Sequence, residues 1–150
     1  MSLSGRLVSQ IEVKSNADVF HEIFAYKPHH LANAFPDIVH SFSLLKGAWG
    51  TVGSVVFGTY TLEGKKNMVK ATIDAVDDST KLITYKVIEG DLMKLYKTIS
   101  VTLQVDTHGD EKFVTWTMEY LKLSPSIPDP NSLMDLALTI TKGIENQNHK

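Results

Sequence analysis

The chain has 150 residues, of which 43% are hydrophobic, and its formal net charge is -2. This length and composition predict a single domain over residues 1–150 with a substantial core. The 15 Lys and Arg residues are scattered, so no basic stripe follows the sequence and nucleic acid is not expected as a partner. The absence of cysteine excludes disulfides, thiolate metal ligands and a cysteine nucleophile.

No segment has the character of a targeting or membrane sequence. Residues 1–6 lack an apolar stretch of signal-peptide length. Nowhere do about eighteen apolar residues run together, as a membrane span requires. We therefore expect a cytoplasmic protein without a membrane partner, present as a monomer or weak dimer.

The first third of the chain predicts one strand and two short helices. Apolar and polar residues alternate over 7–14, which indicates a strand. Asn16 can cap a helix over 18–25, whose apolar residues form one stripe. Pro28 interrupts that pattern, and a second short helix is expected over 29–35.

From about residue 39 to residue 123 the pattern is that of successive strands. Short turns between them favour antiparallel pairing, and with the first strand they make about seven. Strands are predicted over 42–45, 54–62, 67–76, 83–87, 99–105 and 114–120, with turns at 47–53, 63–64, 77–79 and 108–110.

A long helix is predicted to close the chain. Prolines at 125, 128 and 130 end the sheet, and Asp129 with Pro130 is a suitable cap and first-turn pair. The apolar stripe of this helix is wider than a helix on a flat sheet needs, so a curved sheet is expected to grip it. The stripe consists of Leu133, Leu136, Ala137, Ile140 and Ile144, flanked by Met134, Leu138 and Thr141.

Two motifs carry a family resemblance: Lys-Gly-Ala-Trp-Gly-Thr-Val-Gly at 46–53 and Val-Ile-Glu-Gly-Asp-Leu-Met-Lys at 87–94. With the order of elements, they make the chain resemble the plant birch-pollen-allergen superfamily. Trp49 and the run around Met93 are more similar to its major latex protein branch than to the pathogenesis-related class 10 branch. The resemblance implies an α+β helix-grip (START-like) fold: a seven-stranded curved antiparallel sheet around a long C-terminal helix, with two short helices closing one end.

The same resemblance implies a function for the apolar pocket between the sheet and the C-terminal helix. Members bind small hydrophobic metabolites such as hormones, steroids, terpenoids, flavonoids or alkaloids, so a ligand of this kind is expected, in defence, stress or specialised metabolism. A minority are cofactor-independent enzymes, and a cyclase, isomerase or lyase of an iridoid or alkaloid pathway is the alternative for this chain. The fold alone does not decide between them. A hormone-receptor role is disfavoured, because the Ser-Gly-Leu-Pro type of gate loop is missing.

Strand pleating predicts which side chains share the concave face and could line a cavity. At each position the competing interpretation is ordinary core packing. Phe24 is considered beside Phe20 and Ile23 on the first helix. The predicted cavity residues are Phe20, Ile23, Val55, Phe57, Val69, Ala71, Ile73, Ile83, Tyr85, Val87, Ile99, Val101, Leu103, Val114, Trp116, Met118, Leu133, Leu136, Ala137 and Ile140.

Tyr85 and Trp116 stand out within this set, because a buried phenol or indole needs a polar partner, which a ligand oxygen or a water molecule could supply. The resemblance also places Tyr85 where a tyrosine commonly points into the cavity. If the protein is an enzyme, Tyr85 is the candidate proton or hydrogen-bond donor.

No other chemistry is indicated. The glycine-rich turn at 47–53 lacks the Gly-Lys-Ser/Thr ending of a phosphate loop and joins two strands. The charged side chains Lys86, Lys94, Lys97, Lys112 and Glu119 are predicted to face outward or lie in turns, which favours binding over Schiff-base catalysis. The six histidines, at 21, 29, 30, 40, 108 and 149, are expected on the surface and lack metal-ligand spacing, so neither a metal nor a cofactor is predicted.

Overall fold

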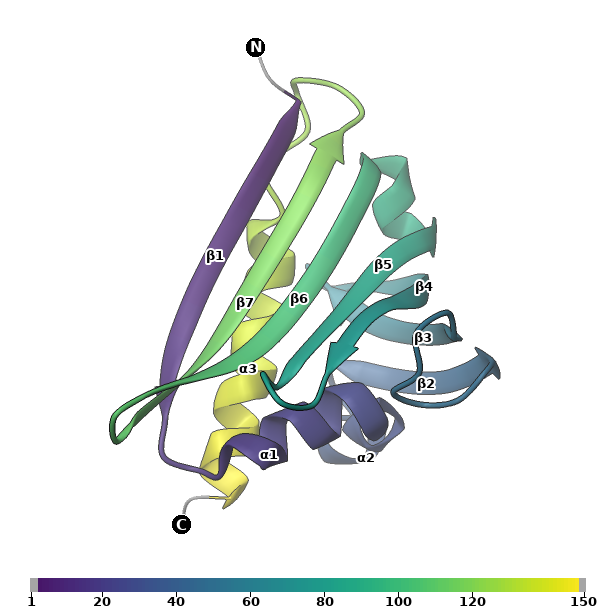
Figure 1. The fold of residues 1–150 in the computed structure, drawn as a ribbon. Helices are drawn as coiled ribbons and strands as arrows, with labels where there is room; N and C mark the ends of the chain where they lie inside the picture. Colours follow the sequence, from purple (N-terminus) through teal and green to yellow (C-terminus); the bar gives the residue numbers. More distant parts are fainter. Residues whose placement is uncertain (1–2, 149–150) are drawn as a thin grey trace.

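A computed structural model describes residues 3–148. One sheet of seven antiparallel strands curves around the C-terminal helix α3, and short helices lie across one end of the grip (Figure 1). This confirms the predicted helix-grip fold. The elements are β1 Ser4–Val13, α1 Ala17–His21, η1 Glu22–Tyr26, η2 Pro28–His30, α2 Leu31–Ala34, β2 Val39–Lys46, β3 Val55–Leu62, β4 Lys65–Asp77, β5 Leu82–Gly90, η3 Asp91–Lys94, β6 Tyr96–His108, β7 Glu111–Lys122 and α3 Asn131–Asn148.

The strand order is β1-β7-β6-β5-β4-β3-β2. The strands from β2 to β7 therefore follow one another through hairpin-like connections, and β1 completes the sheet beside β7. The β4 strand carries register shifts between Lys70 and Ala71 and between Ile73 and Ala75. Such bulges bend a strand and increase its twist, which helps the sheet to curve around α3.

The first helical segment begins as predicted and then widens. The Asn16 side chain accepts a hydrogen bond from the Asp18 N–H at 2.9 Å, which confirms the cap. After His21 the chain continues as the π-helical turn η1. In this turn the Lys27 N–H donates a hydrogen bond to the Glu22 carbonyl at 3.0 Å. The uniform helix expected over 18–25 is therefore divided into an α-helical and a π-helical turn.

The start of α3 differs from the predicted cap. The Asp129 carboxylate accepts hydrogen bonds from the Tyr120 hydroxyl at 2.6 Å and from the Lys122 ammonium at 3.0 Å. These bonds hold the pKa of Asp129 below its usual value, and the hydrogen bond from Tyr120 has the largest effect. The Asp129 side chain therefore connects the segment before α3 to β7. The first hydrogen bond of the helix runs from the Met134 N–H to the Pro130 carbonyl at 3.0 Å.

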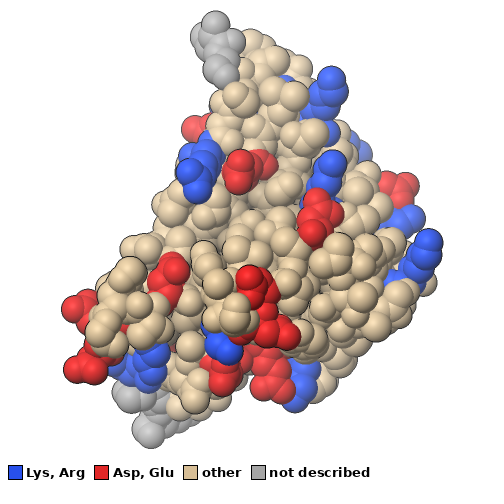
Figure 2. All heavy atoms as spheres, in the orientation of Figure 1, with Lys and Arg blue, Asp and Glu red and all other residues tan. Residues whose placement is uncertain are grey.

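The outer face of the sheet carries charged side chains of both signs. In the view of Figure 2, Lys and Arg are interspersed with Asp and Glu. No helix among residues 3–148 has both the length and the apolar character that crossing a membrane demands.

Candidate functional site

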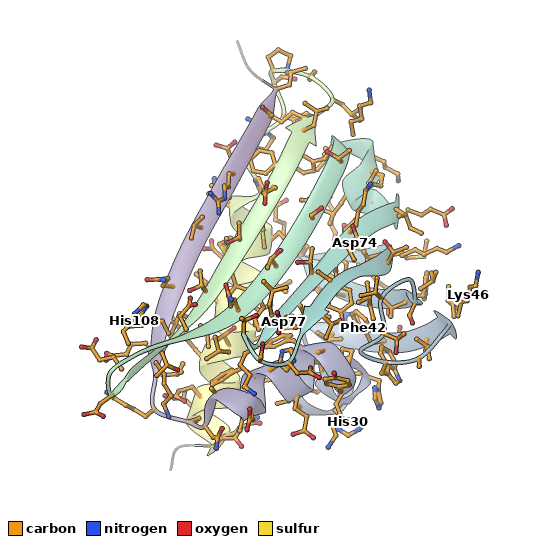
Figure 3. The ribbon with its side chains drawn as sticks, in the orientation of Figure 1. His30, Phe42, Lys46, Asp74, Asp77 and His108 are labelled. Atoms are coloured by element: carbon orange, nitrogen blue, oxygen red, sulfur yellow. The ribbon has the colours of Figure 1, made fainter. Side chains whose placement is uncertain are left out.

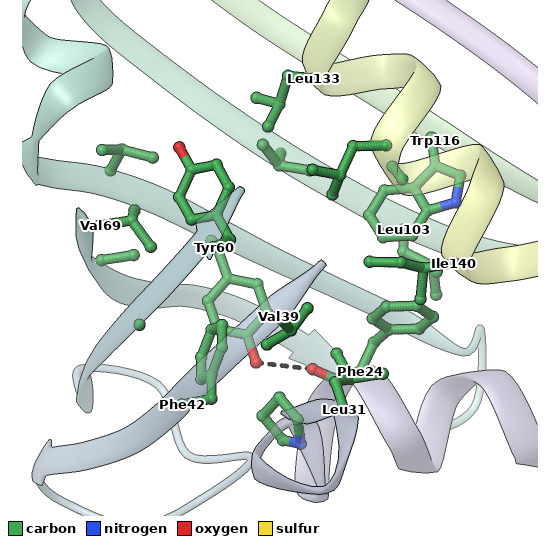
Figure 4. A pocket seen from close by; sticks show the side chains of 18 of the residues that line it. Phe24, Leu31, Val39, Phe42, Tyr60, Val69, Leu103, Trp116, Leu133 and Ile140 are labelled. Carbon is green, nitrogen blue, oxygen red and sulfur yellow. Dashed lines mark hydrogen bonds between the residues drawn. The ribbon is translucent and has the colours of Figure 1, made fainter. Parts of the chain in front are cut away.

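The concave face of the sheet, α3 and the short helices line an apolar cavity of about 180 Å³ (Figure 4). None of its lining residues is Asp, Glu, Lys, Arg or His. The lining consists of Phe24, Pro28, Leu31, Val39, Phe42, Gly58, Thr59, Tyr60, Val69, Ala71, Ile83, Tyr85, Val87, Leu92, Val101, Leu103, Trp116, Met118, Leu133, Leu136, Ala137 and Ile140.

Most residues predicted for the cavity lie around it. They come from β4 to β7 and from α3, the elements whose inward faces are clearly marked by alternation or by the helical stripe. They are Val69, Ala71, Ile83, Tyr85, Val87, Val101, Leu103, Trp116, Met118, Leu133, Leu136, Ala137 and Ile140.

On β3 the predicted face is the wrong one. Phe57 is opposite Ser43 on β2 and Lys70 on β4, so with Val55 it belongs to the outer face of the sheet. The inward face carries Gly58 and Tyr60, both buried. Because apolar residues occur at both parities of this strand, alternation could not identify its inward face.

Other predicted residues are buried in the core but do not reach the cavity. Phe20, Ile73 and Val114 are fully buried in the main apolar cluster. Ile99 is buried in a second cluster, which lies near η3. Ile23 is partly buried against the main cluster. At these positions neighbouring elements pack directly on the sheet and fill the space, which is the outcome that core packing predicts.

Sequence reasoning missed the part of the lining that comes from the short helices and the β2–β3 edge. Leu31 is the first residue of α2, directly after η2, and Val39 is the first residue of β2. Both are apolar and buried, so hydrophobicity alone could have suggested them. The missed residues are Pro28, Leu31, Val39, Phe42, Gly58, Thr59, Tyr60 and Leu92. Phe24, which was considered together with Phe20 and Ile23 on the first helix, also lines the cavity.

The Tyr85 hydroxyl is already paired. It donates a hydrogen bond to the Phe24 carbonyl at 2.6 Å, drawn as the dashed line in Figure 4. In an α-helical continuation the donor to that carbonyl would be the N–H of residue 28, but Pro28 has none. Tyr85 therefore supplies the missing donor and fastens η1 to the sheet. Burial raises the pKa of Tyr85, so the phenol stays protonated and donating.

The Trp116 indole is paired in a similar way. Its Nε1–H donates to the Thr141 Oγ1 at 2.9 Å, and the Thr141 hydroxyl donates to the Ala137 carbonyl at 2.8 Å. Thr141 is fully buried. A ligand oxygen is thus not needed to satisfy Trp116, and this chain of hydrogen bonds joins α3 to β7.

Replacing Thr141 by valine should destabilise the protein. The Thr141→Val change keeps the shape but leaves the buried Trp116 N–H without an acceptor, so we expect a loss of about 1–3 kcal/mol in the free energy of unfolding. Urea unfolding would measure it. Thr139→Val is the matched control, because Thr139 is exposed on the same helix and makes the same type of bond to a carbonyl one turn earlier; equal losses in both variants would contradict the prediction.

Tyr60 differs from Tyr85 and Trp116. Its side chain is 8% exposed, and among residues 3–148 its hydroxyl has no hydrogen-bond partner. Burial, and secondarily the charge of Asp91, raise the pKa of Tyr60. The cavity wall therefore holds a protonated phenol with an unused donor.

The histidines lie outside the cavity lining. His21 is buried, contrary to the expected surface position, and its Nε2 lies 2.9 Å from the Asp78 carboxylate, which also accepts the Tyr26 hydroxyl at 2.7 Å. His29 stacks on Trp49 with ring centres 4.8 Å apart, and burial lowers its pKa.

Three further histidines among residues 3–148 are on the surface. His30 and His108 are exposed at the short helices and at the β6–β7 turn (Figure 3). His40 is exposed on β2 beside Thr61, and His149 lies outside the described residues.

Charged groups are likewise kept out of the cavity. Lys86, Lys94, Lys97 and Glu119 are exposed, and the Lys112 ammonium donates to the Lys14 carbonyl at 3.0 Å. Within residues 3–148 no three His, Asp or Glu side chains gather as a metal site would require.

The glycine-rich turn between β2 and β3 is held by its own hydrogen bonds. The Ala48 N–H donates to the Ser54 Oγ at 2.9 Å, and the Ser54 hydroxyl donates to the Ala48 carbonyl at 2.8 Å. Gly50 has φ +74°, and a Cβ there would collide with the Tyr26 ring. These contacts give the glycines of this turn a structural role.

The sheet, the helix that it grips and the apolar cavity between them together define a helix-grip protein. The chain belongs to the pathogenesis-related protein Bet v 1 family, whose profile matches residues 2–148. It is 41% identical to MLP-like protein 43 of Arabidopsis thaliana over 146 residues, which cover 96% of this chain and 92% of that protein.

Further relatives confirm the resemblance to major latex proteins. MLP-like protein 28 of Arabidopsis thaliana is 42% identical over 146 residues, 96% of this chain; the chain spans only 44% of that longer protein. The crystal structure of ginseng major latex-like protein 151 from Panax ginseng superposes with a TM-score of 0.94, at 40% identity and with 99% of each chain covered.

Proposed function

We propose that the protein binds a small, uncharged hydrophobic molecule in the cavity. The observation that carries this proposal is a space of about 180 Å³ between the sheet and α3 whose lining contains no charged side chain. Apolar surface in such a space is withdrawn from water when a molecule enters, which favours binding. Because the relatives are plant proteins, the proposed ligand is a plant metabolite, handled in defence, stress or specialised metabolism.

Binding is favoured over catalysis by the chemistry of the lining. General acid–base catalysis needs a titratable group within reach of the substrate and a pKa near the working pH. The phenols of Tyr60 and Tyr85 both have raised pKa values, and the Tyr85 hydroxyl is held by Phe24. A cavity of this kind can hold and shield a molecule but has no base poised near neutral pH.

The proposal is tested by filling the cavity. Ala137 lines it from α3 and is buried, so the Ala137→Leu change places three more carbon atoms in the space. We expect tetralin, a neutral two-ring hydrocarbon, to bind the wild-type protein and to lose affinity by roughly tenfold or more in this variant. Isothermal titration calorimetry would measure both affinities.

The matched control is Ala34→Leu, the same change at an exposed position on α2. It should leave tetralin affinity unchanged. Thermal unfolding should show both variants folded. Failure of tetralin to bind the wild-type protein, or equal binding to the wild type and to Ala137→Leu, would overturn the proposed function.

A further inference from the structure

Strand β1 forms one edge of the sheet, and no other strand of residues 3–148 lies on its outer side (Figure 1). Its pairing with β7 runs from Ser4 to Val13 without a register shift. An edge strand presents a row of backbone N–H and C=O groups with which a further strand can pair. The length and regularity of β1 therefore make it a surface to which another strand can add.

The opposite edge of the sheet, β2, is less regular. Its pairing with β3 shifts register between Val39 and Ser41 and again between Leu44 and Lys46. Irregularities of this kind bend an edge strand and hinder its pairing with a further strand. The ten residues of β1 contain no proline, and only two of them are charged, one positively and one negatively. Of the two edges, β1 is thus the one suited to a partner.

The backbone groups of β1 that point away from β7 belong to alternate residues. The Lys122 N–H donates to the Leu3 carbonyl at 2.8 Å, and in an antiparallel pair directly bonded residues alternate with unbonded ones. The even-numbered residues from 6 to 12 therefore turn their N–H and C=O groups toward the open edge. Their side chains are exposed on the outer face of the sheet, and that of Val8 has 51% of its surface exposed. These residues are Arg6, Val8, Gln10 and Glu12.

We propose that β1 is a self-association surface, on which β1 of a second copy of this chain pairs antiparallel about a two-fold axis at Ser9. In this register Arg6 of each copy lies opposite Glu12 of the other, and Val8 lies opposite Gln10. Because the two strands are identical, each contact occurs twice. Backbone hydrogen bonds over residues 6–12 then join the two sheets into one. Pairing along one strand edge covers less surface than a standard interface, so the dimer is weak and forms reversibly.

Charge complementarity selects this register. Opposite charges that face each other across two strands stabilise the pair, and like charges destabilise it. If one strand slides by two residues, Arg6 faces either Gln10 or Lys14 in place of Glu12. Within its own chain Arg6 is opposite Glu119 of β7, so the second copy places a further carboxylate on the other side of the guanidinium. The inference concerns the edge of the sheet and is independent of the function proposed for the cavity.

Charge reversal tests both the surface and the register. Arg6→Glu places two carboxylates opposite each other at both charged positions of the pair, so we expect the dissociation constant of the dimer to rise by roughly tenfold. Glu12→Arg should weaken the dimer to a similar extent, because two guanidinium groups then face each other. An equimolar mixture of the two variants restores both opposite-charge contacts and should dimerise about as tightly as the wild type. Sedimentation equilibrium would measure each dissociation constant.

Lys86→Glu is the matched control, because Lys86 is exposed on β5 within the sheet and the change alters net charge as Arg6→Glu does. It should leave the dissociation constant unchanged. In hydrogen exchange, the amides of Val8 and Gln10 should become more protected as the protein concentration rises. A mixture that dimerises no better than either variant alone would overturn the proposed register. A wild-type protein that sediments as a monomer at every concentration would overturn self-association and leave the edge to a strand of a different protein.

Discussion

Replacing Gly90 by alanine should destabilise the protein by about 3–5 kcal/mol, since a strained backbone and a steric collision act together. Gly90 ends β5 with φ +122° and ψ -171°, a conformation that is essentially restricted to glycine. A Cβ at this position would collide with the backbone carbonyl oxygen of Met68 on β4. Because backbone atoms cannot rotate away, the two strands would have to move apart.

Urea unfolding of Gly90→Ala would measure this loss. Gly109→Ala separates the two causes, because Gly109 also has a positive φ, +64°, but a Cβ there meets open space. We expect that control to lose only about 1–2 kcal/mol, the cost of the left-handed conformation. Similar losses in the two variants would show that the approach of Met68 is unimportant.

This prediction gives the motif at 87–94 a structural meaning. Beside Gly90, the Asp91 carboxylate accepts a hydrogen bond from the Met68 N–H at 2.7 Å, and this bond is the main reason why the pKa of Asp91 is lowered. Gly90 thus allows β4 to approach closely, and Asp91 holds it there through the hydrogen bond from Met68.

The individual strands and helices could be predicted because their signals are local, and the family resemblance implied how they are arranged. Alternation, short turns and the Asn16 cap each act over a few residues, and each has a direct counterpart in the structure. The wide stripe on α3 similarly indicated that a curved sheet would grip the helix.

The details of the site depend on partners distant in the sequence. Tyr85 meets the Phe24 carbonyl across 61 positions, and Trp116 meets Thr141 across 25. No local pattern shows that these polar atoms find each other, so both tyrosine and tryptophan were interpreted as candidates for ligand contact. The inward orientation of Tyr60 was missed for a different reason, because β3 has apolar residues on both faces and only its pairing with β2 and β4 fixes the parity.

Replacing Phe20 by alanine should cost about 3–5 kcal/mol of stability, the range for removing a large aromatic side chain from a closed core. Phe20 was predicted to line the cavity, but it is 0% exposed and packs within the main apolar cluster, where α1 meets β6. A lining residue borders the cavity on one side. Phe42 is such a residue, since it lines the cavity from β2 and is only partly buried.

The pair Phe20→Ala and Phe42→Ala distinguishes core from cavity wall. In urea unfolding we expect Phe20→Ala to lose at least twice as much stability as Phe42→Ala, for which about 1–2 kcal/mol is expected from its smaller buried area. The two variants should rank the other way in a tetralin titration. Phe42→Ala should change the affinity for tetralin more than Phe20→Ala does, because only Phe42 borders the space that the probe enters. Reversal of the stability order would return Phe20 to the cavity wall, since a side chain beside empty space leaves few contacts to lose.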